Sequence, residues 1–157
     1  MRDIEIYVDG DACPVKAEIY RVAARYGLKV FVVANSFFMV PNDPKIERVI
    51  VEGSFDAADD WIASHAQSGD VVVTADIPLA DRCLKAGAAV IGNTGVPFTA
   101  DSIGMALASR ALMSDLRAMG EITGGPKPMA GRDKSRFLSA LDETIVRLRR
   151  AQKTGRR

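Results

Sequence analysis

The stretch IYVDGDACPVKAEI, Ile6–Ile19, changes from a buried strand to a helix and carries two carboxylates at the change. An apolar run predicts a strand over residues 4–8. A proline in the first turn and apolar residues at helical spacing predict a helix over residues 14–26. Asp9 and Asp11 therefore lie where a strand ends and a helix begins.

The same alternation of strand and helix continues along the chain. Continuous apolar runs predict strands covered on both faces, and amphipathic segments with polar starts and glycine stops predict helices. This order predicts an α/β fold, a three-layer α/β/α sandwich with a mostly parallel central sheet of about five strands. We expect a single domain over residues 1–150 and a basic, disordered tail over 151–157. The further strands are expected at 28–34, 46–51, 70–75 and 88–93, and the further helices at 54–68, 76–87, 99–120 and 133–150.

Composition is that of a soluble globular protein. The chain has 157 residues, of which 48% are hydrophobic and 26% charged. No segment resembles a signal peptide, and no apolar run approaches the roughly 20 residues that a membrane span needs. The two cysteines, Cys13 and Cys83, form no CxxC pair, and we expect both to be reduced in a cytoplasmic protein.

The charges are divided unevenly along the chain. Residues 1–126 carry 11 Lys/Arg against 17 Asp/Glu, whereas residues 127–157 carry 10 against 3. An acidic body is suited to hold cations and a basic segment to hold phosphates. A solvated helix with a frayed tail is the simpler alternative.

Three carboxylates follow two of the predicted strands. Asp9 and Asp11 come after the first strand, and Asp76 follows the fourth in VVVTAD. Sites in parallel sheets form beyond the carboxyl ends of the strands, so the three converge if these strands are neighbours. Oxygen ligands without a histidine cluster favour Mg²⁺ or Mn²⁺.

The other aspartates have two interpretations. Asp81 and the helix-start acids can extend the acidic cluster, or each can cap a helix. Capping is favoured for a single helix-start aspartate, but it does not explain three carboxylates at two strand exits. The near-repeats TADIPLA (74–80) and TADSIGMA (99–106) pose the same choice, and capping is favoured for the second. The acids open to both readings are Asp56, Asp59, Asp60, Asp81 and Asp101.

Cys13 and Lys16 lie beside the paired acids. A helix start lowers a thiol pKa, but a nucleophilic cysteine also needs a base. The one histidine, His65, belongs to another helix and is expected on the surface, so we expect Cys13 to pack as a small apolar residue. Lys16 is a candidate to offset the acidic charge or contact a phosphate, with solvent exposure as the equal alternative.

Two segments are candidates for binding nucleic acid. Asn35 and Ser36 leave the second strand on the same edge of the sheet as the acids. GGPKPMAGRDKSRF, residues 124–137, combines a glycine-rich loop with four cations, a composition that attracts a phosphate backbone. Few aromatic residues interleave with these cations, so base stacking is not indicated there. The cations are Lys127, Arg132, Lys134 and Arg136.

The strings DGDACPVK, VVTADIPLA, TADSIG and GGP with RDKSRF resemble the YaiI/YqxD family of small bacterial proteins, from Ile4 to about Leu148. That family is grouped with the PIN-like superfamily of α/β/α sandwiches, whose members are often metal-dependent ribonucleases. The resemblance implies one acid after the first strand, one on a middle helix and one after the fourth strand. Asp9 with Asp11, one of Asp56, Asp59 and Asp60, and Asp76 match these places, with Asp81 as a further acid. The doubled Asp-Gly-Asp and the Cys-Pro after it depart from the PIN pattern.

The preferred hypothesis is a Mg²⁺- or Mn²⁺-dependent nuclease that acts on RNA. Its catalytic residues would be Asp9, Asp11, Asp76 and Lys16, and its metal ligands Asp9, Asp11, Asp76, Asp81 and Asp59. One alternative is a phosphatase of the haloacid-dehalogenase type, with Asp9 as nucleophile, Asp11 as acid and Thr74 on the phosphate. Another is a module that binds RNA without turnover. A trapped aspartyl-phosphate on Asp9 would favour the first alternative, and metal-dependent stabilisation without cleavage would favour the second.

Overall fold

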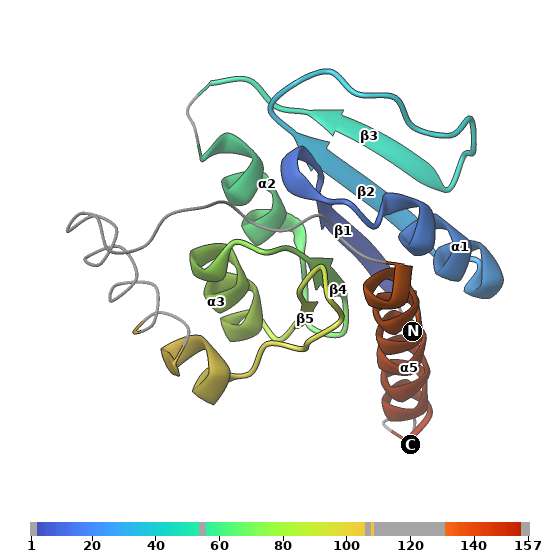
Figure 1. The fold of residues 1–157 in the computed structure, drawn as a ribbon, viewed down its shortest axis with the longest axis vertical. Helices are drawn as coiled ribbons and strands as arrows, with labels where there is room; N and C mark the ends of the chain where they lie inside the picture. Colours follow the sequence, from blue (N-terminus) through green and yellow to red (C-terminus); the bar gives the residue numbers. More distant parts are fainter. Residues whose placement is uncertain (1–2, 54–55, 106–107, 109–130, 155–157) are drawn as a thin grey trace.

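The computed structural model describes residues 3–53, 56–105, 108 and 131–154. Its centre is one parallel sheet with strand order β3-β2-β1-β4-β5 (Figure 1). The strands are β1 Glu5–Asp9, β2 Lys29–Ala34, β3 Ile46–Ile50, β4 Val71–Val73 and β5 Ala89–Ile91. The helices are η1 Gly10–Ala12, α1 Lys16–Tyr26, α2 Ala57–His65, α3 Ile77–Lys85 and α5 Gly131–Thr154.

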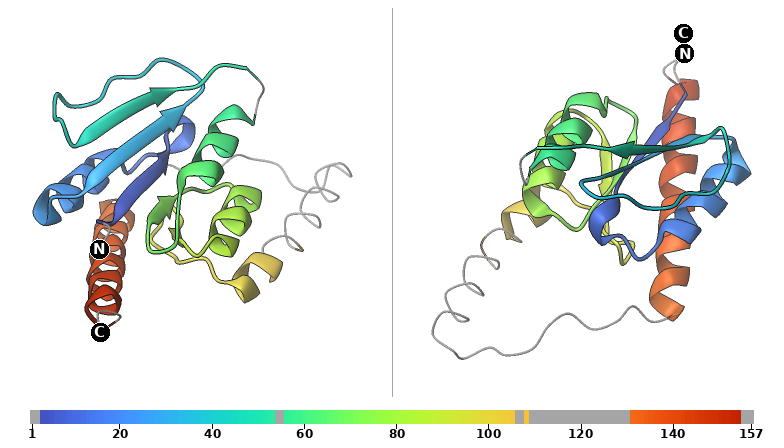
Figure 2. Two further views of the ribbon diagram at one scale, coloured as in Figure 1. Left: turned by 180° about the vertical axis from the view of Figure 1, so that it is seen from behind. Right: turned by 90° about the horizontal axis from the view of Figure 1, so that it is seen from above.

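The predicted three-layer α/β/α sandwich is confirmed, because helices cover both faces of the sheet (Figure 2). On one face, α1 and α5 pack over Ile6, Val8 and Val30. On the other face, α2 and α3 pack over Tyr7 and Val72. A strand buried on both faces has no polar side to expose, which explains the continuous apolar runs.

Strands β1 and β4 are neighbours at the centre of the sheet. Val8 of β1 is in register with Val32 of β2 and with Val73 of β4. The chain continues from β2 to β3 on one side of β1 and from β4 to β5 on the other. The gap between the exits of β1 and β4 is therefore the topological switch point, where ligands of such sheets bind.

Several element boundaries differ from the predicted ones. Helix α1 begins at Lys16, later than predicted, because Cys13 has an extended backbone that separates the short helix η1 from α1. Strand β4 has three residues and begins after the buried Asp70, whose side chain accepts hydrogen bonds from the backbone N–H groups of Glu5 and Gln67. These bonds fasten the start of β4 to β1.

Helix α5 is longer than the predicted helix at both ends. Residues 151–154 of the predicted tail continue this helix, and residues 155–157 lie outside the described part of the chain. Of the helix predicted at 99–120, residues 100–105 and 108 are helical, and the remainder after residue 105 lies outside the described residues. Ser54, the expected start of the second helix, also lies outside them.

Among the described residues, no helix is both long enough and apolar enough to cross a membrane.

Candidate functional site

Thr74 joins the exits of β1 and β4 at the switch point. Its buried hydroxyl donates a hydrogen bond to Oδ2 of Asp9 over 2.9 Å and accepts one from the backbone N–H of Asp76 over 3.0 Å. Asp9 is the last residue of β1, and Asp76 directly precedes α3. One hydroxyl therefore links the two carboxylate-bearing segments that the sequence predicted to converge.

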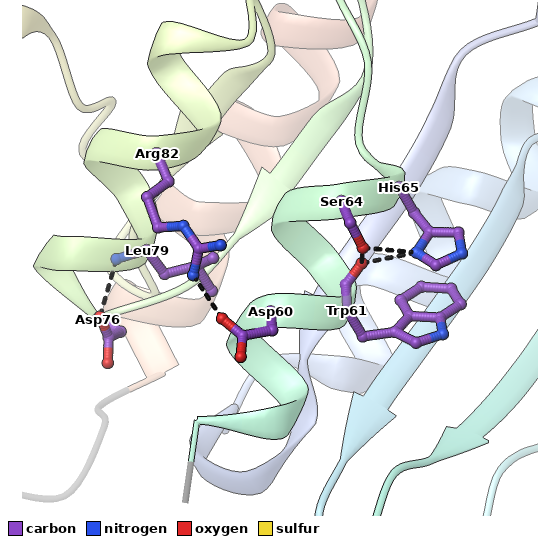
Figure 3. Close-up of polar contacts among 7 residues, drawn as sticks. All are labelled: Asp60, Trp61, Ser64, His65, Asp76, Leu79 and Arg82. Carbon is purple, nitrogen blue, oxygen red and sulfur yellow. Dashed lines mark hydrogen bonds and ion pairs between the residues drawn. The ribbon is translucent and has the colours of Figure 1, made fainter. Parts of the chain in front are cut away.

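Asp76 caps helix α3, and one of its two oxygens makes the cap. Oδ1 accepts a hydrogen bond from the backbone N–H of Leu79 over 2.9 Å, whereas the other oxygen points away from Leu79 (Figure 3). In the second TAD motif the cap is made differently, because Thr99 and Ser102 exchange backbone-to-hydroxyl hydrogen bonds as a capping box. This bears out capping as the reading of the second motif.

Helix α2 carries two neighbouring aspartates, Asp59 and Asp60, which have different surroundings. Asp60 pairs with Arg82 of α3 over 2.9 Å, as Figure 3 shows. Its neighbour Asp59 is half-buried, and the negative charges of Asp76 and Asp9 repel its ionised carboxylate. Of the three candidate acids on the middle helix, Asp59 is thus the one that belongs to the cluster at the switch point.

Two carboxyl groups at this edge, those of Asp59 and Asp9, have raised pKa values. Burial, with the charges of Asp76, Asp9 and Asp56, raises the pKa of Asp59 to about 6, and Arg82 lowers it only in part. Burial also raises the pKa of Asp9; the hydrogen bond from Thr74 opposes this, and the charges of Asp76 and Asp11 add to it. We call Asp9, Asp59 and Asp76 the switch-point carboxylates. In their ionised forms they repel one another without full compensation.

We expect an Asp59→Asn variant to gain stability over the wild type as the pH rises. The pKa of Asp59 is about 6 in the folded protein against an ordinary 3.8, so the folded state holds the proton more tightly. The contribution of this group to the free energy of unfolding therefore falls between about pH 4 and pH 6. The variant lacks this loss. Urea unfolding in a chelating buffer at pH 4, 5 and 7.5 measures it.

The matched control for that measurement is Glu143→Gln, which removes one exposed carboxylate on α5. Its stability difference from the wild type should stay flat over the same pH range. An equally flat difference for Asp59→Asn would contradict the raised pKa of Asp59.

Asp11 holds the loop that follows β2. One of its oxygens accepts a hydrogen bond from the backbone N–H of Asn35 over 2.9 Å, and the other accepts one from the hydroxyl of Ser36 over 3.3 Å. The structure thus brings Asn35 and Ser36 to the acidic edge. Both Asp11 oxygens are used within the loop, so no described contact presents Asp11 as an acid for the phosphatase alternative.

Cys13 packs against the core formed with α1 and α5, as predicted. Burial raises the pKa of its thiol to about 11, and a hydrogen bond with the backbone of Val15 and the charge of Lys16 only partly oppose this. The expected lowering of the pKa at a helix start is therefore outweighed by burial. A thiol of this kind is a poor nucleophile at neutral pH. The ammonium of Lys16 lies 5.4 Å from the ring centroid of Phe38.

Of the remaining predicted site residues, one forms an ion pair within its own helix, three are exposed on α5, and one lies outside the described chain. Asp81 pairs with Lys85 of its own helix over 2.9 Å. Arg132, Lys134 and Arg136 are exposed in the first turns of α5. Lys127 lies outside the described residues. The assignments of these residues to metal or nucleic acid stay predictions.

Gly95 shows that the basic turns of α5 lie at the same edge of the sheet as the carboxylates. It belongs to the loop that follows β5, and a Cβ added there would lie 3.0 Å from the carbonyl oxygen of Arg136. Its φ of 86° is also in the left-handed region, which favours glycine. Exposed cations therefore lie close to the loop after β5, at the end of the sheet where Asp9 leaves β1.

The chemistry of the donors fits a hard divalent cation. The switch-point carboxylates offer oxygen ligands only, and their mutual repulsion would be relieved by a bound ion. Their side chains are not arranged as a finished site: across the part of the chain that the structure describes, no three His, Cys, Asp or Glu side chains are grouped closely enough to hold one ion. Asp9 and Asp76 each use one oxygen in the hydrogen bonds described above.

The sequence interpretation missed the role of Thr74 in joining these two exits, because it considers this residue as a phosphate ligand or as part of a helix-start motif. The signal was present, since a threonine two residues before an aspartate at a helix start commonly accepts a hydrogen bond from the backbone at that position. It also missed the aromatic residues of the loop after β2, whose cationic partners come from other elements.

Fold and site together define a parallel α/β/α sandwich protein with an acidic cluster at its topological switch point. The chain belongs to the YaiI/YqxD family, since the family profile described as "Uncharacterized BCR, YaiI/YqxD family" matches residues 7–147. The resemblance of its motifs to this family is thereby confirmed.

Relatives from several bacteria match this chain along most of their own length. A UPF0178 protein of Bradyrhizobium diazoefficiens is 63% identical over 145 residues, 92% of this chain and 87% of the relative. One from Rhodopseudomonas palustris strain BisB18 is 59% identical over 155 residues, 99% of this chain and 100% of the relative. One from Caulobacter sp. strain K31 is 60% identical over 145 residues, 92% and 96%. No solved structure matches the chain.

Proposed function

We propose that this protein is a PIN-like nuclease that hydrolyses RNA phosphodiester bonds with Mg²⁺ or Mn²⁺. The observation that carries the proposal is the convergence of the switch-point carboxylates where β1 and β4 end, with Thr74 joining the two exits. There, burial together with the neighbouring negative charges raises the pKa of Asp59 to about 6 and also raises that of Asp9. Groups whose pKa is shifted by burial and by one another cluster at functional sites. A divalent cation is the simplest charge that would make these three carboxylates compatible.

Asp9, Asp59 and Asp76 would hold the ion, and the ion would supply an activated water and neutralise charge on the phosphate. Thr74 orients Asp9 through its hydroxyl and fixes the backbone before α3. The exposed cations Arg132, Lys134 and Arg136 would attract the RNA backbone, and the attraction would weaken with added salt.

The test is cleavage of 5′-labelled single-stranded RNA by the purified protein. We expect cleavage with Mn²⁺ or Mg²⁺, none after chelation, and recovery when the metal is restored. Asp76→Asn should lower the rate by about 100-fold or more, because an amide is a weak ligand, whereas its oxygen can still cap α3. Glu143→Gln, which removes the same charge on exposed α5, should cleave like the wild type.

Equal cleavage by wild type and Asp76→Asn would mean that a contaminating nuclease or another site is responsible. Binding of RNA without cleavage in the presence of either metal would contradict the nuclease proposal and support a module that binds RNA without turnover.

A further inference from the structure

The loop that follows β2 exposes two large apolar side chains beside the acidic edge. Phe37 is 67% exposed and Met39 is 78% exposed. The two residues before Phe37 hydrogen-bond to Asp11, which lies two residues after the end of β1. An exposed aromatic ring thus follows directly after a segment that is fastened to the acidic edge.

Cations from two other elements lie over consecutive rings of this loop. The guanidinium carbon of Arg48, in β3, lies 4.6 Å from the ring centroid of Phe37. Its Nη1 donates a hydrogen bond to the carbonyl oxygen of Phe38 over 3.1 Å, which restrains the guanidinium. Lys16 of α1 lies 5.4 Å from the ring centroid of Phe38. The loop therefore carries its aromatic residues already paired with positive charge.

An exposed aromatic ring paired with a cation is better suited to bind a nucleobase than to form a protein–protein interface. A base is a flat ring of about the size of a phenyl group, and it stacks on aromatic side chains and on arginine without regard to its identity. The large apolar side chains exposed here are Phe37 and Met39 of the loop and Ile50 of β3, which is 40% exposed, and charged Glu47 and Arg48 are exposed on the same strand. A stable protein interface buries more than about 1,000 Å² in total, which so few apolar side chains do not supply.

We propose that Phe37 and Arg48 form a stacking platform for an unpaired base of single-stranded RNA, in the loop whose first residues hydrogen-bond to Asp11 at the carboxyl end of the sheet. The inference rests on the proposed nuclease function and deepens it, because it names the substrate class as single-stranded. Bases inside a duplex are stacked on one another and cannot reach such a platform.

Fluorescence anisotropy of a labelled oligouridine in chelating buffer tests the platform without cleavage. Phe37→Ala should weaken binding about 5- to 100-fold, as expected for the loss of one base stack. Phe37→Tyr, which keeps an aromatic ring, should bind like the wild type. Arg48→Lys should weaken binding several-fold although the charge is kept, because an ammonium does not stack as a guanidinium does. The control Lys153→Ala, an exposed cation near the end of α5, should have the small effect of one lost charge.

A second probe separates stacking from charge. An oligonucleotide of equal length without bases should bind wild type and Phe37→Ala equally. In a Trp61→Phe background, which removes the one native tryptophan, Phe37→Trp should lose fluorescence on binding oligouridine. Met105→Trp, at a position that is 75% exposed, serves as the control in the same background and should show little change.

Equal affinity of wild type and Phe37→Ala for oligouridine would overturn the platform, and the nuclease function would still be decided by the cleavage assay. Base-dependent binding through Phe37 without cleavage in either metal would uphold the platform and overturn the nuclease. Sedimentation showing a wild-type dimer that Phe37→Ala dissociates, with RNA binding unchanged, would make the loop a protein interface and overturn the platform.

Discussion

An Asp9→Asn variant is expected to lose RNA cleavage by about 100-fold or more while its melting temperature stays the same or rises by about 1–3 °C. Burial and the charges of Asp76 and Asp11 disfavour the ionised carboxylate of Asp9. An amide removes that repulsion, and its oxygen can still accept the hydrogen bond from Thr74. A lower cleavage rate together with an unchanged or higher melting temperature distinguishes a residue required for catalysis from one required for stability.

Both quantities are measured on the same preparations: cleavage rate with saturating Mn²⁺, and melting temperature at pH 7.5 in a chelating buffer. Glu143→Gln controls for the loss of one negative charge at an exposed position. A variant Asp9→Asn that melts several degrees lower and cleaves like the wild type would show that Asp9 is a structural residue.

A Gly10→Ala variant is expected to lose about 1–3 kcal/mol of the free energy of unfolding, or about 2–10 °C in melting temperature. A Cβ at Gly10 would lie 2.8 Å from Cγ1 of the buried Val32 and 3.1 Å from the carbonyl oxygen of Val33. The backbone carbonyl cannot rotate away, so η1 must move off β2. That movement would shift Asp9 and Asp11, and cleavage should fall as well.

Gly104→Ala is the matched control, because a Cβ there would meet nothing within 4 Å in a helical segment. It should be neutral or slightly stabilising, since alanine is the better helix former. Urea unfolding of both variants decides the matter, and equal stabilities would contradict the close approach of η1 to β2.

Packing, and not a left-handed turn, explains why a glycine lies between the two acids. A turn between carboxylates would favour a glycine with positive φ, but Gly10 is absent from the positive-φ glycines of the described chain. The glycine is needed because η1 packs directly on β2. Close packing between residues that are 22 positions apart leaves no local mark in a sequence.

Four of the strands were predictable from their apolar runs, whereas β3, at the edge of the sheet, carries the exposed Glu47 and Arg48 at its centre. The edge of the sheet that carries the site followed from the parallel order of the strands. The spacing of Asp59 and Asp60 did not show which of them joins the cluster, because adjacent helical residues point about 100° apart and only the packing of α2 on α3 decides. Arg82 on α3 forms an ion pair with Asp60, whereas burial and the charges of Asp76 and Asp9 raise the pKa of Asp59.

The aromatic platform was unpredictable for a similar reason. Few aromatic residues lie among the cations of 124–137, so no base stacking is indicated there. The cation of the proposed platform, Arg48, instead comes from β3, and Lys16 of α1 lies over the next ring, Phe38; both meet the loop only in the folded chain.

Binding of Mn²⁺ measured by titration calorimetry at pH 7.5 tests the central claim most directly, because it requires neither RNA nor turnover. The wild type and Glu143→Gln should show the same saturable binding, and Asp9→Asn and Asp76→Asn should each weaken it at least about tenfold, as expected when one carboxylate ligand is lost. No binding to the wild type, or equal binding to all four proteins, would contradict a cation site at the switch-point carboxylates.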